Sequence, residues 1–161
     1  MNGIVAILKK WYGGFEHAAS SLQSVLLLVI RLYWGWQLFE SGVGKFQHID
    51  KVVEFFGSLN LPAPEVTARL ISGLELVGGA LLFVGLFARP ISLLLTGNMI
   101  AAYITADREA FFSFLSEPDK FQGAAPFIYL LVSLIVLIFG PGSLSLDGVI
   151  SRVWNKREAK S

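Results

Sequence analysis

The chain has 161 residues, of which 54% are hydrophobic and 16% are charged, and its formal net charge is +1. Ordinary soluble domains carry about a quarter charged residues, so this chain is too apolar to hide its hydrophobic surface in one soluble core. The near-balanced charge removes the attraction on which nucleic-acid binding depends, and the absence of cysteine excludes disulfides, thiolate metal sites and iron–sulfur clusters.

Four segments are apolar over the length that a helix needs to cross a bilayer, about 17 to 25 residues. They comprise residues 22–46, 66–87, 91–107 and 124–139. Pro90 suits the first position of the third helix, so we expect a tight turn at residues 88–90. The fourth segment stops at a Gly-Pro-Gly sequence and is short, so it should stand nearly upright. The sequence therefore predicts an all-α membrane protein, a bundle of four transmembrane helices.

Charged and apolar side chains are mixed at helical spacing in two connecting segments, residues 49–59 and 108–121. Short amphipathic helices on the membrane surface explain this pattern, and a lid over a cavity is the alternative that stays open. Residues 147–160 form a third amphipathic segment, whose basic side chains would rest on anionic headgroups. We therefore divide the chain into an N-terminal interfacial segment (1–20), a four-helix transmembrane domain (21–142) and a basic amphipathic cytoplasmic tail (143–161).

Basic residues are shared unevenly between the two ends of the predicted bundle. One end holds Lys9, Lys10, Arg89, Arg152, Lys156, Arg157 and Lys160, and the other holds Lys45, Lys51, Arg69, Arg108 and Lys120. The more basic end of a membrane protein normally faces the cytoplasm. We therefore expect a multi-pass protein of the bacterial inner membrane, with the lipid bilayer around it and both chain ends in the cytoplasm.

Three ionisable residues, Arg31, Glu40 and Glu75, lie inside the predicted spans. An unpaired charge at that depth costs about 3 kcal/mol or more, so such residues normally face the bundle interior and have partners. A rise of about 1.5 Å per residue from the predicted span ends puts Arg31, Glu75 and Asn98 at similar depths. We expect Arg31 to contact Glu75 with Asn98 close by, while Glu40 lies on the opposite side of its helix and nearer the outer face.

This buried polar site has two interpretations. A salt bridge between Arg31 and Glu75 can fix the helix register without any further role, or the site can bind a headgroup or ligand and move protons. Lys45 and Asp107 are expected at the outer interface as a surface ion pair. The sequence has no clustered metal-ligand spacing and no nucleotide-binding glycine loop, so we expect no metal and no covalently attached cofactor.

Several sequence elements occur in the order in which a known family has them. They are Arg31-x-x-x-Gly35-x-x-x-Phe39-x-x-Gly42-x-x-Lys45-Phe46, Leu61-Pro62-x-Pro64, Glu75-x-x-Gly78-Gly79-Ala80-Leu81-Leu82-x-x-Gly85-Leu86-x-x-Arg89 and Gly140-Pro141-Gly142-x-x-Ser145-Leu146-Asp147. In this set the chain resembles the DoxX family (DoxX/DoxD-like) of bacterial four-helix membrane proteins. The resemblance extends over most of the chain.

The resemblance implies a function as well as a fold. The family takes its name from a subunit associated with a terminal quinol oxidase, DoxD-type relatives are linked to thiosulfate:quinone oxidoreduction, and other members belong to membrane complexes that resist oxidative stress. It therefore implies an accessory or quinone-interacting subunit of a membrane oxidoreductase, with a quinone as ligand and redox-complex subunits or further copies of the chain as partners. The alternative is a non-enzymatic membrane scaffold, assembly factor or small-molecule transporter. Whether the chain catalyses a reaction itself stays open, because family membership is a warrant for fold and not for catalysis.

Overall fold

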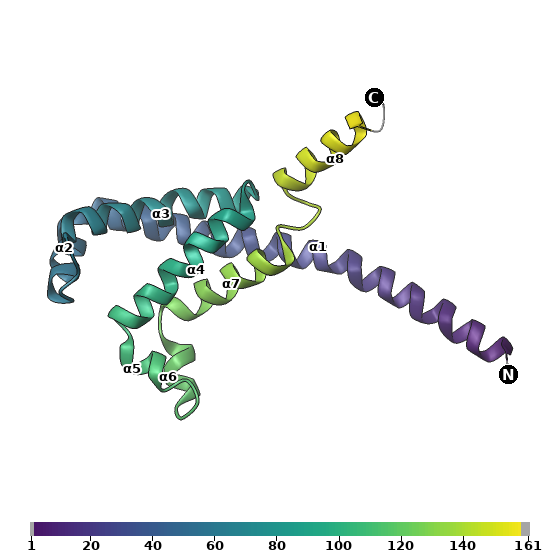
Figure 1. The fold of residues 1–161 in the computed structure, drawn as a ribbon, viewed down its shortest axis with the longest axis horizontal. Coiled ribbons are helices and arrows are strands. Elements are labelled where there is room, and N and C mark those ends of the chain that lie inside the picture. The colour runs from purple at the N-terminus through teal and green to yellow at the C-terminus, as the bar shows by residue number, and fades with distance from the viewer. Residues whose placement is uncertain (1, 159–161) are drawn as a thin grey trace.

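A computed structural model describes the backbone of residues 2–158 and the side chains of residues 11–16 and 19–158. Over this range every regular element is a helix, as the sequence predicts (Figure 1). The elements are α1 (Asn2–Gln47), α2 (Ile49–Ser58), α3 (Pro64–Val84), α4 (Ala88–Thr105), α5 (Arg108–Phe112), α6 (Pro118–Gly123), α7 (Pro126–Phe139) and α8 (Leu146–Glu158).

Two helix pairs form the bundle. α1 packs along α3, and α4 packs along α7, with further contacts of α3 to α4 and of α1 to α7. Glycines bring α1 and α3 into backbone contact, because a Cβ atom at Gly42 would overlap the backbone of Leu76 and one at Gly79 would overlap the backbone of Phe39. Between the pairs lies an apolar core built from all four helices, which includes Leu38, Leu82, Leu95, Met99, Val132 and Val136.

The first helix is much longer than its predicted span. α1 has 46 residues and therefore a length of about 69 Å, more than twice the hydrocarbon thickness of a bilayer. It runs without a break through the predicted boundary between residues 20 and 21, and its N-terminal part projects well beyond the other helices (Figure 1). An interfacial position for the first 20 residues remains a prediction, and of the predicted tail, residues 159–161 lie outside the described residues.

Two described helical stretches, Trp11–Gln47 and Pro64–Val84, are long and apolar enough to cross a membrane by length and composition. Only 22% and 33% of their most apolar windows are buried, so neither resembles the core helix of a soluble protein. The other two predicted spans form helices of 18 and 14 residues, α4 and α7. A count of four spans therefore stays a prediction.

The turn between α3 and α4 differs from the expected one. Gly85, whose φ is 71°, directly follows the last residue of α3, and Phe87 (φ 48°) precedes the first residue of α4. Pro90 is therefore the third residue of α4 and not the first, so the expected turn at residues 88–90 is wrong. The reason is the side chain of Asp147, which accepts hydrogen bonds from the backbone N–H groups of Phe87 and Ala88 and so fixes the start of the helix earlier.

The connecting segments are helical as well. Of the predicted segment 49–59, all but the last residue forms the single helix α2, whereas residues 108–121 are divided between the short helices α5 and α6. Near the other end of the bundle, α8 leaves the last turn and points away from the other helices (Figure 1).

Candidate functional site

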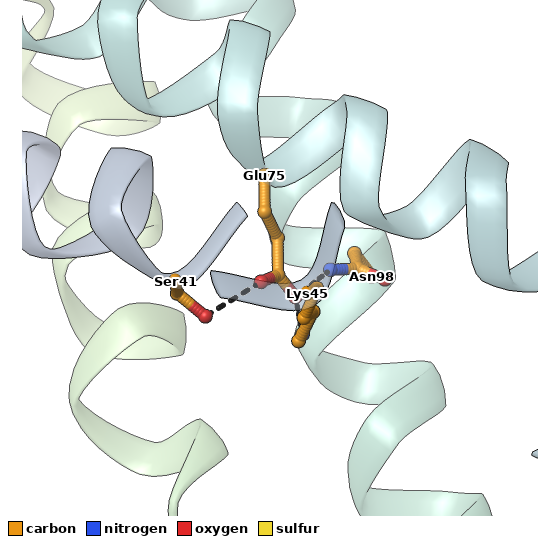
Figure 2. Close-up of polar contacts among 4 residues, drawn as sticks. All are labelled: Ser41, Lys45, Glu75 and Asn98. Atoms are coloured by element: carbon orange, nitrogen blue, oxygen red, sulfur yellow. Dashed lines mark hydrogen bonds and ion pairs between the residues drawn. The ribbon is translucent and has the colours of Figure 1, made fainter. Parts of the chain in front are cut away.

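A carboxylate on α3 is the centre of a polar cluster. The Oε1 atom of Glu75 accepts hydrogen bonds from Lys45 Nζ at 2.5 Å and from Asn98 Nδ2 at 3.3 Å, and its Oε2 atom accepts one from Ser41 Oγ at 2.9 Å. Figure 2 shows the three donors converging on this carboxylate. Ser41 and Lys45 are four residues apart on α1 and so share one helix face. Glu75 is 4% exposed, and a buried charge needs such partners.

Arg31 does not belong to this cluster, so the expected contact between Arg31 and Glu75 is wrong. Its guanidinium group is fully buried and donates to three backbone carbonyl oxygens, those of Leu82, Phe83 and Leu144. Two of these carbonyls end α3, where a helix leaves acceptors free and favours a cation. The predicted depth of Arg31 assumed that residue 22, the start of the apolar span, lies level with the end of α3. Instead α1 begins well before residue 22, and the end of α3 lies beside Arg31.

Two further expectations need correction. Glu40 is not buried in the polar site but exposed on α1, and among the described residues none forms a hydrogen bond or ion pair with it. Lys45 forms its ion pair with Glu75 and not with Asp107, because Gly42, three residues before it, holds this face of α1 against α3. Asn98 lies against Glu75, where it was expected. A ligand or proton role for these residues remains a prediction.

The Glu75 cluster lines a cavity of about 720 Å³ between α1, α2, α3, α4 and α7. Most of its lining is apolar, and its polar groups include the Glu75 cluster, Tyr129 and, on more exposed parts of the chain, Lys51 and Asp107. An apolar chamber with a few convergent polar groups is typical of small-molecule sites.

The amphipathic helix α2 forms one wall of this cavity. Val52, Phe55 and Phe56 of α2, with Leu59 just after it, line the cavity. Residues 49–59 therefore cover one side of a cavity, which is the feature that the lid interpretation of this segment requires. On the outer side of the same helix lie charged residues, including Asp50 and Glu54, both of which are exposed.

At the opposite end of the bundle, a second polar cluster joins the helix ends. Besides the bonds of Arg31, Asp147 caps α4 and its own backbone N–H donates to the carbonyl of Gly85. Ser145 Oγ accepts the N–H of Gly148 at the start of α8. These contacts give a structural reason for several residues of the sequence elements that carry the family resemblance, namely Arg31, Gly85, Ser145 and Asp147.

A third charged pair lies outside the predicted spans. Lys120 Nζ of α6 donates to Glu109 Oε2 of α5 at 3.1 Å. This hydrogen bond and the charge of Glu109 raise the pKa of Lys120 above its usual value. Both side chains are exposed, so the pair contributes little stability.

The sequence interpretation missed Ser41 and Lys45 as partners of Glu75. A usable signal was present, because at 100° per residue Lys45 falls on the same α1 face as Gly35 and Gly42, and those glycines face α3.

Comparisons with known proteins agree with these features. The DoxX family model matches residues 26–108. The Bacillus subtilis protein named "Putative oxidoreductase CatD" is 35% identical over 122 residues, which cover 74% of this chain and 83% of that protein. An uncharacterized Haemophilus influenzae protein is 29% identical, over 81% of this chain and 86% of its own, and an uncharacterized membrane protein of Mycobacterium tuberculosis is 28% identical, over 78% and 82%. No solved structure matches the chain. The match to the family model and the similarity to CatD show that the chain is a membrane protein of the DoxX family.

Proposed function

We propose that the chain is an accessory subunit of a membrane oxidoreductase system and that it binds a quinone-like molecule in the cavity beside Glu75. The observation that carries this proposal is the Lys45–Glu75 pair, whose carboxylate is buried, in the wall of a mostly apolar cavity. The name of the Bacillus subtilis relative, "Putative oxidoreductase CatD", supports the redox setting.

The residues present fit such a ligand. A quinone has an apolar ring and tail with two carbonyl oxygens, and the cavity offers apolar walls together with the donors Lys45 and Asn98. A bound quinone would supply two-electron, two-proton chemistry. Glu75 lines the cavity as well, and three hydrogen bonds hold its carboxylate in one position where it would face a bound ligand. Lys45, whose side chain is 32% exposed, compensates the carboxylate charge.

We also propose that α1, α3, α4 and α7 all span the inner membrane, with both chain ends in the cytoplasm. Exposed apolar side chains on the two shorter helices support this, notably Leu93 and Leu94 on α4 and Ile138 and Phe139 on α7. α7 has a length of about 21 Å, so the bilayer would thin locally around it. In this orientation the cavity and α2 lie at the outer half of the membrane.

The test is equilibrium binding of a short-chain ubiquinone analogue to the detergent-purified protein. The doubly neutral variant Lys45→Gln, Glu75→Gln removes both charges from the cavity wall at similar volume, and we expect it to fold and to bind the analogue at least about tenfold more weakly. The variant Glu109→Gln, Lys120→Gln is the matched control, because it removes an ion pair outside this cavity. Equal affinity for the native protein and the cavity variant would overturn the proposal.

The non-enzymatic alternative makes the opposite forecast for the same variant. A scaffold or assembly factor needs the bundle but not the charges in its cavity. A correctly inserted neutral variant that keeps its cellular role in full would therefore favour that alternative.

A further inference from the structure

The exposed face of α1 carries a regular sequence repeat. Tyr12, Phe15, Ala19, Leu22, Leu26 and Val29 are all exposed and follow one another at alternating spacings of three and four residues. This is the 3.5-residue period of a two-stranded coiled coil, with Ala19 and Leu26 at a positions and Phe15, Leu22 and Val29 at d positions. The same register continues into the bundle through Tyr33 and Trp36, which are 56% and 50% exposed.

Part of this face has no bundle helix to cover it. The N-terminal part of α1 projects beyond the other helices (Figure 1). Its large apolar side chains are highly exposed: Trp11 78%, Tyr12 64% and Phe15 71%. Gly13 and Gly14 weaken this stretch as an isolated helix, and a Cβ atom at either would meet nothing within 4 Å. Helices in proteins owe most of their stability to packing, so this segment needs an apolar partner.

We infer that the partner is a second copy of this chain, bound through α1 in a parallel, two-stranded coiled coil. Copies in one membrane share their orientation, so their α1 helices run parallel. A twofold interface requires a self-complementary surface, and a heptad stripe meets this condition because each a or d side chain meets its counterpart. The cavity beside Glu75 lies on a different face of α1, so this inference is independent of the proposed ligand.

Glu40 gains a role from this register. It is the next a position after Tyr33, and it lies between Phe39 and Gly42, which touch Gly79 and Leu76 of α3. Its level is thus only a few residues from the middle of α3 (Pro64–Val84), where an unpaired carboxylate facing lipid would be costly. Across the interface the Glu40 carboxyl of one copy faces that of the other, and when one carries a proton its O–H donates to the other oxygen. A single polar a position commonly fixes the register and the number of strands.

Single cysteines test the interface, because the native chain has none. Leu22→Cys and Val29→Cys lie at d positions, whereas Ser20→Cys lies at a b position on the far side of α1 at nearly the same level as residue 22. Each full-length variant is oxidised in isolated membranes with copper phenanthroline. We expect disulfide-linked product at twice the chain mass of 17.7 kDa from both d-position variants, at least about tenfold more than from Ser20→Cys.

A second variant pair gives a readout without cross-linking. Phe15→Glu puts two like charges at a d position outside the bundle, while Ser20→Glu adds the same charge on the far side. The mass of the purified protein in detergent should be that of two chains for the native protein and for Ser20→Glu, and that of one chain for Phe15→Glu. A native mass of one chain, or equal cross-linking at residues 20 and 22, would overturn the inference. A native mass of one chain would mean that lipid, and not a second copy, covers the apolar face of α1.

Discussion

The guanidinium group of Arg31 lies so close to Gly85 that a methyl group at residue 85 would overlap it. Gly85 also has a φ of 71°, in the left-handed region that glycine adopts without strain. From this position Arg31 reaches the carbonyl of Leu144 at 2.6 Å, beyond the end of α7. One arginine therefore ties α1 to the end of α3 and to the segment before α8, and the glycine supplies the space.

The variant Gly85→Ala should therefore be markedly less stable. The left-handed conformation alone costs an alanine about 1–2 kcal/mol, and the displaced guanidinium group would lose buried hydrogen bonds in addition. Thermal unfolding in detergent measures the change. Gly97→Ala on α4 is the control, because a Cβ atom there would meet nothing within 4 Å and alanine favours a helix. Equal unfolding temperatures for the two variants would contradict this account.

Asp147 should stabilise the folded protein by capping the start of α4. Its two carboxylate oxygens each accept a backbone N–H, from Phe87 and from Ala88, at 2.9 Å. Removing such a cap costs about 0.5–2 kcal/mol, so Asp147→Ala should lower the unfolding temperature, and Asp147→Asn, which keeps one acceptor oxygen, should lower it less. Glu54→Ala removes an exposed carboxylate of α2 and serves as the control. A loss as large in the control would rule out the cap as the cause.

Helix positions could be predicted from the sequence because apolar length is a local property. The predicted segment 124–139 differs by two residues from α7 (Pro126–Phe139), and 66–87 by two or three from α3 (Pro64–Val84). The start of α1 was not predicted, since polar residues and paired glycines before residue 22 break the apolar run without breaking the helix.

The partners of the buried charges could not be predicted by counting along single helices. The depth of Arg31 relative to Glu75 depends on the register of α1 against α3, and that register is set by the backbone contacts at Gly42 and Gly79. When the end of one span is misplaced by several residues, the predicted partner of Glu75 becomes Arg31, whereas the structure has Lys45. The helix faces were more informative than the depths, because the glycine stripe on α1 already included Lys45.

The proposed topology predicts which side of the membrane each connection faces. Ser58 at the end of α2 and Ser151 in α8 are both exposed and can each be replaced by the only cysteine of the chain. An impermeant maleimide added to spheroplasts should label Ser58→Cys and not Ser151→Cys, and should label both after lysis. The reverse pattern would invert the orientation, and equal labelling of the two variants in spheroplasts would contradict an odd number of spans between these sites.

The last prediction concerns the unequal burial of the two partners in the Lys45–Glu75 pair. The side chain of Glu75 is 5% exposed and that of Lys45 is 32% exposed. Removing one partner of a buried pair is costly because the other charge stays uncompensated. Lys45→Met leaves the deeply buried carboxylate and should cost about 3 kcal/mol, whereas Glu75→Gln leaves a lysine that water can still reach and should cost about 1–2 kcal/mol. Chemical unfolding of the two variants in detergent measures the difference.

The double variant Lys45→Met, Glu75→Gln completes the cycle. Since neither charge is then left unpaired, its loss should be smaller than the sum of the two single losses, and smaller than that of Lys45→Met alone. Ser41 and Asn98 donate to different oxygens of Glu75, so the amide oxygen of the new glutamine can still accept from Asn98, while its NH2 group can donate to the hydroxyl oxygen of Ser41. Strictly additive losses would mean that the two side chains are not energetically coupled, and a larger loss for Glu75→Gln than for Lys45→Met would mean that Lys45 is the more costly charge to leave alone.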